Sequence, residues 1–148
     1  MAVQATTRGI RGNNPGNIRK SDATRELIGL SVFQDDPGFW TFFTPEYGIR
    51  AIAKLLLTYQ RKHRLFSCAQ IIGRWAPSSD SNPTTAYAEF VATQLNVNSN
   101  EDVDLEDTAT LTKMVKAIIH FENGRQPYDT ETIARGIRLA TGNIGVIG

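Results

Sequence analysis

Residues 111–124 combine a strongly amphipathic helical pattern with one charged side chain in a position that the pattern reserves for an apolar one. Apolar residues recur at the spacing of a core-facing helix, at Leu111, Met114, Val115, Ile118 and Ile119. Glu122 is the next position on that stripe, and Asn123-Gly124 supply a helix stop. We therefore predict a helix that ends with a carboxyl group facing the core.

A carboxyl group in such a place is suited to proton transfer. Burial and the negative end of a helix dipole both disfavour the ionised form of a carboxyl group. A general acid needs a carboxyl group that keeps its proton near neutral pH. Glu122 is thus the candidate catalytic residue, and the alternative is an ordinary solvent-exposed glutamate in a fraying last turn.

The bulk properties indicate one globular domain over residues 1–148, with loose termini at 1–7 and 143–148. A formal net charge of +1 gives no electrostatic reason to expect a nucleic-acid partner. No apolar run approaches the roughly 20 residues that a membrane span needs. The first residues also lack the apolar core of a signal peptide.

The sequence predicts neither a metal site nor a cofactor. A single cysteine, Cys68, excludes an internal disulfide and any cysteine-based metal cluster, and a small core residue is its simplest role. The two histidines, His63 and His120, lie far apart and lack the spacing of metal ligands.

The rest of the chain predicts an α+β fold that is mainly α, with about five helices and a small β-hairpin sheet. Residues 8–19 are rich in glycine, asparagine and proline, and predict a tightly bent loop. Residues 30–34 and 39–43 read as two strands joined by a turn. Cap residues predict the starts of the remaining helices, at Thr44-Pro45, Ser67, Asn82-Pro83 and Asp129.

Four segments carry a resemblance to a known family. They are R-G-I-R-G-N-N-P-G-N-I-R from Arg8, Y-G-I-R-A from Tyr47, R-W-A-P from Arg74, and E-N-G from Glu122. In this order they resemble bacteriophage proteins described as virion-associated structural proteins or predicted murein hydrolases. The resemblance covers roughly residues 8–124. Gly12 departs from it, because the family usually carries an asparagine there; if that asparagine contacts substrate, this chain lacks the contact.

A second resemblance concerns the order of the segments. In lysozyme-like lytic transglycosylases a catalytic glutamate ends a helix, and a polar loop and small sheet follow it. Here Ile118–Gly124 resembles that helix but lies near the C-terminus, whereas the polar loop and hairpin lie near the N-terminus. The chain therefore looks like a circularly permuted lysozyme-like fold, which is plausible because domain termini often lie close together. The resemblance implies cleavage of the β-1,4 bond between N-acetylmuramic acid and N-acetylglucosamine.

Several side chains are candidates for binding the glycan. Asn14 and Asn17 offer amides suited to sugar hydroxyl and acetamido groups, with turn formation as the alternative. Trp75 and Tyr87 offer rings that stack on sugars or orient Glu122, with core packing as the alternative for Trp75. Tyr128, six residues past Glu122, is a candidate for the lining of the same cleft, with packing as the alternative.

A second catalytic carboxylate is harder to find. Glu46, Asp35 and Asp36 are candidates, although the first reads equally as a first-turn helix acid and the others as turn residues. No second carboxylate stands out, which favours a reaction with one acid in which a group of the sugar itself assists.

Together these patterns predict a phage glycosidase that degrades peptidoglycan. Its expected partners are peptidoglycan glycan strands and other virion proteins, and it would act in the host periplasm after arriving in the virion or from the host cytoplasm. The alternative is a non-catalytic virion protein that keeps a lysozyme-like fold to bind murein or a neighbouring subunit.

Overall fold

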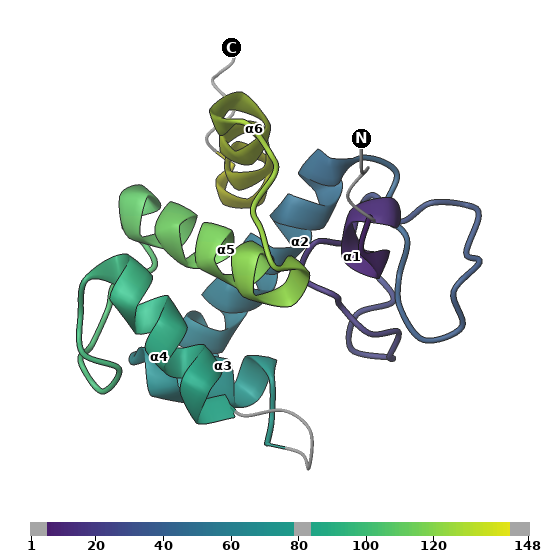
Figure 1. Ribbon diagram of the computed structural model, residues 1–148. Coiled ribbons are helices and arrows are strands. Elements are labelled where there is room, and N and C mark those ends of the chain that lie inside the picture. Colours follow the sequence, from purple (N-terminus) through teal and green to yellow (C-terminus); the bar gives the residue numbers. More distant parts are fainter. Residues whose placement is uncertain (1–5, 79–83, 143–148) are drawn as a thin grey trace, which may run out of the picture.

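The computed structural model describes residues 6–78 and 84–142, and this part of the chain contains six helices (Figure 1). They are α1 (Arg8–Arg11), α2 (Pro45–Arg61), α3 (Cys68–Trp75), α4 (Thr84–Leu95), α5 (Thr108–Asn123) and α6 (Thr130–Thr141). The prediction of a mainly helical protein is confirmed. Within the described ranges, no helix is long and apolar enough to cross a membrane.

The helix boundaries follow from local cap chemistry. The Ser67 side chain accepts a hydrogen bond from the Gln70 backbone at the start of α3, and Asp129 accepts one from Thr132 at the start of α6. α5 ends at Gly124, which adopts a left-handed conformation with φ of 77° that favours glycine. These predicted boundaries are confirmed, whereas the predicted helix start at residues 82–83 lies outside the described residues.

The core forms around α2. This helix packs mainly against α6 and also contacts α3 and α5, while α4 packs against both α3 and α5. Figure 1 shows α5 crossing α2, with α6 on one side of α5 and α3 and α4 on the other side. The apolar stripe predicted for α5 is buried at every position, at Leu111, Met114, Val115, Ile118 and Ile119.

The structure does not show the predicted β-hairpin sheet: residues 12–44 form loops, in which the two predicted strands pair only where Ser31 N–H donates to the Thr41 carbonyl and Phe43 N–H to the Gly29 carbonyl. Only single antiparallel bridges occur there, between Arg19 and Phe39 and between Leu30 and Phe42. The reason is the side chain of Gln34, which donates to the carbonyl oxygens of Ser31 and Thr41 and accepts from the Thr41 backbone N–H. A side chain thus occupies the hydrogen-bonding positions that an opposing strand would use.

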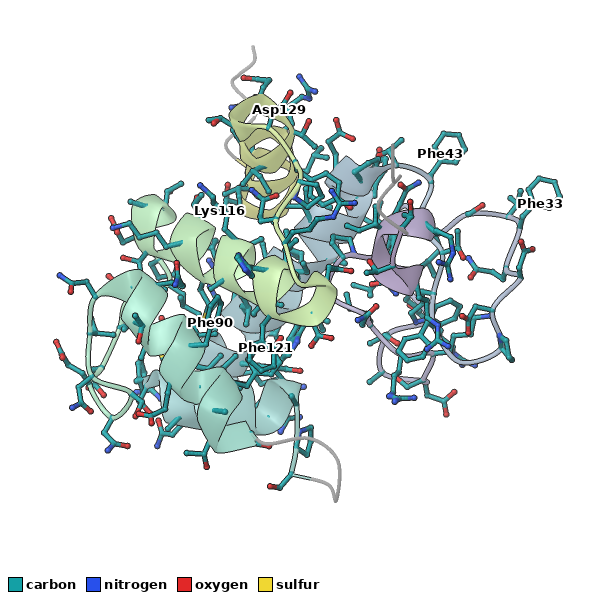
Figure 2. All side chains as sticks on the ribbon, viewed as in Figure 1. Phe33, Phe43, Phe90, Lys116, Phe121 and Asp129 are labelled. Carbon is teal, nitrogen blue, oxygen red and sulfur yellow. The ribbon has the colours of Figure 1, made fainter. Side chains whose placement is uncertain are left out.

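Aromatic residues of this loop region point in opposite directions. Phe42 is buried in the core, whereas its neighbour Phe43 is 70% exposed and Phe33 is 76% exposed. Figure 2 shows Phe33 and Phe43 projecting away from the helices. Ile28 and Val32 are exposed as well, so the loop region presents several large apolar side chains to its surroundings.

The N-terminal segment is more ordered at its end than predicted. Thr7, expected to belong to a loose terminus, caps α1 by accepting from the Ile10 N–H and donates to Asn123 Oδ1 at 2.6 Å. Arg8–Arg11 form a helical turn where a loop was expected. The remaining loose-terminus predictions, for residues 1–5 and 143–148, lie outside the described residues.

Residues 13–17 lie directly on α2, and Gly48 makes this possible. A Cβ atom at position 48 would stand 2.0 Å from the Asn13 carbonyl oxygen and 2.8 Å from Pro15 Cδ. No side chain fits in that space, so the loop and the helix approach each other backbone to backbone. Gly73 in α3 is a useful contrast, because a Cβ there has no neighbour within 4 Å in the described structure.

We predict that Gly48→Ala lowers the free energy of unfolding by about 1–3 kcal/mol, since the added methyl group overpacks a rigid backbone contact. Gly73→Ala is the matched control and should raise it by about 0.5–1 kcal/mol through helix propensity alone. Urea unfolding followed by tryptophan fluorescence measures both. Equal stability of Gly48→Ala and the wild type would show that the loop does not rest on α2 as described.

Candidate active site at the end of helix α5

Two donors from distant parts of the chain hold the Glu122 carboxylate. Asn17 Nδ2 donates to Oε1 at 2.9 Å, and the Tyr87 hydroxyl donates to Oε2 at 2.8 Å. Glu122 itself is half-buried, so the apolar environment expected from its place on the stripe is replaced by a polar one. Each carboxylate oxygen receives one hydrogen bond and retains a second lone pair for a substrate or a proton.

Tyr87 reaches Glu122 from the core. The residue is 1% exposed, and its ring stacks on Phe121 with the ring centroids 3.9 Å apart. Figure 2 places Phe121 next to Phe90, whose ring lies 5.7 Å away. Burial raises the pKa of the Tyr87 hydroxyl, the nearby Glu122 charge and hydrogen bond raise it further, and a hydrogen bond with Trp75 acts in the opposite sense. The hydroxyl group therefore remains a donor across the physiological pH range.

Asn123, the neighbour of Glu122, fastens the N-terminal loop to the same helix end. Its side-chain amide donates to the Pro15 carbonyl at 2.8 Å, and its Oδ1 accepts from the Thr7 hydroxyl. The residue is buried, with 6% of its surface exposed. The sequence identified Asn123 only as part of a helix stop, because nothing in the local pattern reveals a partner more than 100 residues away.

A large open cleft runs along Glu122 between the N-terminal loops and the ends of α2 and α3. Its volume is about 1220 Å³. Asn17 and Glu122 lie on its lining, and Trp75 at the end of α3 lines it too. Gly16 keeps the loop close to this tryptophan, since a Cβ there would stand 2.9 Å from Trp75 Cζ2.

Comparison with known proteins places this chain among bacteriophage proteins. No model of a known protein family matches it. It is 38% identical over 135 residues to Protein P5 of Pseudoalteromonas phage PM2, a match that covers 90% of this chain and 82% of the relative. The chain belongs to the family of that phage protein. The predicted bacteriophage link is thereby supported, and the name of the relative specifies no activity.

The structure brings some of the predicted site residues of this phage family member together and separates others. Asn17, Trp75 and Glu122 line one cleft, with Tyr87 directly behind Glu122. Asn14 is buried and fully occupied: its amide donates to the carbonyls of Ile18 and Trp40, and its Oδ1 accepts from the Ile18 N–H. Asn14 therefore shapes the loop and has no free polar group for a sugar.

Glu46 and the aspartates of the loop lie elsewhere. Glu46 pairs with Arg135 of α6 at 3.2 Å and is not among the residues that line the cleft. Asp35 and Asp36 line a smaller neighbouring cavity of about 360 Å³, which shares Asn17 and Phe39 with the cleft, and Asp36 pairs there with Arg8 at 3.2 Å. Among the residues that the structure describes, Glu122 is thus the one carboxylate on the cleft lining.

Tyr128 also lies away from the cleft lining. Its hydroxyl oxygen is buried and finds no hydrogen-bond partner among residues 6–78 and 84–142. Burial raises the pKa of this hydroxyl to about 12, and the positive charge of Arg125 acts in the opposite sense. A buried hydroxyl without a partner costs free energy of folding. Tyr128 is therefore a packing residue whose hydroxyl group slightly destabilises the fold.

We predict that Tyr128→Phe leaves the free energy of unfolding unchanged or raises it by about 1 kcal/mol at pH 7, because an unpaired hydroxyl is removed. Above pH 10 the unfolded state loses its phenol proton before the folded state does, so the stability contributed by this group falls as the pH rises toward 12. Urea unfolding at pH 7, 10 and 11 should therefore show a shallower decline for the variant. An identical decline in both proteins would contradict the assigned burial of the hydroxyl.

Proposed function

We propose that this protein is a bacteriophage glycosidase that cleaves the β-1,4 bond between N-acetylmuramic acid and N-acetylglucosamine in peptidoglycan. The observation that carries the proposal is a carboxylate held by two donors on the wall of a large open cleft. The cleft exceeds the roughly 300–1,000 Å³ that is usual for small-molecule pockets, in keeping with an extended glycan. The enzyme would reach the host wall from the virion or from the host cytoplasm.

The chemistry requires one residue to act first as an acid and then as a base. Protonated Glu122 donates its proton to the glycosidic oxygen while the bond from that oxygen to C1 breaks. The resulting carboxylate then takes a proton from the nucleophile that attacks C1. If the C6 hydroxyl of the same sugar attacks, a 1,6-anhydro ring forms; if water attacks, a reducing end forms. A single carboxylate on the described lining fits the first route, in which the substrate supplies its own nucleophile.

Asn17 and Tyr87 serve this reaction by orienting the carboxyl group. Their hydrogen bonds fix the carboxylate plane, so the remaining lone pairs of Glu122 point in a defined direction. Trp75 adds an aromatic surface to the same cleft, which suits packing against a sugar ring.

We also propose that the fold is a circularly permuted relative of the lysozyme fold. Two features support this proposal. A glutamate stands at the end of helix α5, and the polar loop that faces it comes from the opposite end of the chain. In the unpermuted order a loop of this kind would follow the helix directly.

A second candidate function is a non-catalytic virion protein that binds murein or a neighbouring subunit. The exposed apolar side chains of the N-terminal loops favour it, namely Ile28, Val32, Phe33 and Phe43. Such groups suit a contact with another protein of the virion. The two functions differ in what a substitution at Glu122 does.

We predict that Glu122→Gln abolishes the clearing of purified murein, lowering the rate at least about 100-fold, because an amide cannot deliver the proton. Asn17 can still donate to the amide oxygen, and the amide NH2 group can donate to the Tyr87 hydroxyl oxygen, so the fold should be retained. Turbidity of a murein suspension measures the rate, and mass spectrometry of the products separates anhydromuramic ends from reducing ends.

Glu89→Gln is the matched control for this experiment, since Glu89 is exposed on α4 and does not line the cleft. It should clear murein at the wild-type rate. Equal clearing by Glu122→Gln and the wild type would show that Glu122 is not the catalytic acid. No clearing by a folded wild type would favour the non-catalytic virion protein.

We predict that Tyr87→Phe lowers kcat about tenfold and leaves KM nearly unchanged, since it removes one hydrogen bond of about 1.4 kcal/mol from the Glu122 carboxyl group. The ring remains stacked on Phe121, so circular dichroism should show an unaltered fold. An unchanged kcat would mean that Asn17 alone suffices to orient Glu122.

A further inference from the structure

The cleft that contains Glu122 also collects positive charge. Arg19, Lys62, His63 and Arg74 all lie on its lining. Within the described part of the chain, no carboxylate forms an ion pair with Arg19, Lys62 or Arg74. Glu122 receives its hydrogen bonds from uncharged groups. The lining thus has an excess of cationic side chains, although the whole protein is close to neutral.

The two guanidinium groups are held in place by aromatic rings. The Arg19 guanidinium carbon lies 4.6 Å from the centre of the Phe39 ring, and that of Arg74 lies 5.3 Å from the centre of the Tyr59 ring. Tyr59 in turn meets Trp75 edge to face, with the ring centres 6.3 Å apart. Both guanidinium groups are exposed but oriented, which lowers the entropy lost when they bind a ligand.

His63 reports how close these charges are to one another. Desolvation lowers its pKa, and the charges of Arg74 and Lys62 lower it further. The Arg74 and Lys62 charges therefore disfavour protonation of the imidazole, which lies beside Tyr59. An anion bound among these groups would offset the positive charges of Arg74 and Lys62 and so raise the pKa of His63.

We propose that Arg19, Lys62 and Arg74 bind the carboxylate groups of the short peptides that branch from the glycan strand. The inference rests on the proposed function and specifies its substrate as peptide-bearing glycan. Guanidinium groups match carboxylates in geometry and can bind them through two parallel hydrogen bonds. The glycan then lies along Glu122 and Trp75, and its peptides reach the cationic part of the lining.

A nucleic acid fits the cleft less well. Single-stranded nucleic acid needs free aromatic faces on which its bases stack. In this cleft one face of Phe39 and one face of Tyr59 carry guanidinium groups, so Trp75 is the main aromatic surface left on the described lining, whereas a strand of bases needs several. The formal net charge of +1 also supplies little long-range attraction for a polyphosphate.

The test is the binding of a fragment that has no bond to cleave. N-acetylmuramyl-L-alanyl-D-glutamate carries two carboxylates, and its diamide is the matched neutral ligand. The dicarboxylate should bind the wild type at least about tenfold more tightly than the diamide, by isothermal titration calorimetry at low salt. Arg19→Gln and Arg74→Gln should each remove most of that difference. Lys116→Gln, an exposed change on α5 away from the cleft, should retain it (Figure 2).

Nuclear magnetic resonance gives a second readout, because the chain has only two histidines. Addition of the dicarboxylate should raise the pKa of His63 and leave His120 on α5 unchanged. Equal binding of the dicarboxylate and the diamide, or an equal loss in Lys116→Gln, would overturn the proposal. Tighter binding of a short single-stranded oligonucleotide would overturn it in favour of a nucleic-acid ligand.

These outcomes are separate from those of the proposed catalysis. Fragment binding without any murein clearing would retain the carboxylate site and remove the glycosidase. Murein clearing that depends on Glu122, together with equal binding of the dicarboxylate and the diamide, would retain the glycosidase and remove the carboxylate site.

Discussion

The contact between the end of α5 and the N-terminal loop determines most of what this protein presents to a ligand. Two consecutive side chains make it: Asn123 donates to the Pro15 carbonyl, and Glu122 accepts from Asn17. Asn123 thus fastens the loop, and the fastened loop in turn orients the carboxyl group of Glu122. The loop forms one wall of the cleft, so the cleft depends on this polar contact.

Polar groups in this contact are buried, which makes their pairing costly to disturb. Asn14 is buried with its side chain fully hydrogen bonded within the loop, and Asn123 is buried between the loop and α5. Backbone approach at Gly48 adds a steric match on the other side of the loop. The loop is therefore held by hydrogen bonds at one side and by close packing at the other, although it contains almost no regular secondary structure.

Sequence reasoning predicted those features that depend on neighbours along the chain. The apolar stripe of α5, its glycine end and the caps at Ser67 and Asp129 are local patterns, and the structure confirms each of them. The predicted hairpin is present only as a short antiparallel contact around Leu30 and Phe42, because the Gln34 side chain takes hydrogen-bonding positions that a longer pair of strands would use. Strand propensity contains no information about such a side-chain contact.

The candidate site was predictable only in part, for the same reason. The sequence does not distinguish Asn14 from Asn17, because both lie in the same asparagine-rich loop. In the structure the Asn14 side chain binds within the loop, whereas that of Asn17 binds Glu122. The Glu46 side chain pairs with Arg135, a residue 89 positions later. No spacing rule connects residues so far apart, whereas Glu122 was identifiable because a helical stripe led to it.

The contact between α5 and the loop joins distant parts of the sequence, and this affects how the protein folds. The hydrogen bonds from α5 to the loop join residues that are 105 to 116 positions apart. Contacts of such long range are slow to form, since most of the chain must be ordered before they close. During synthesis the loop emerges long before its partner, and a nascent chain that ends before α5 contains the loop but lacks both Glu122 and Asn123, the residue that fastens the loop. The cleft described above therefore requires a chain that extends at least to the end of α5.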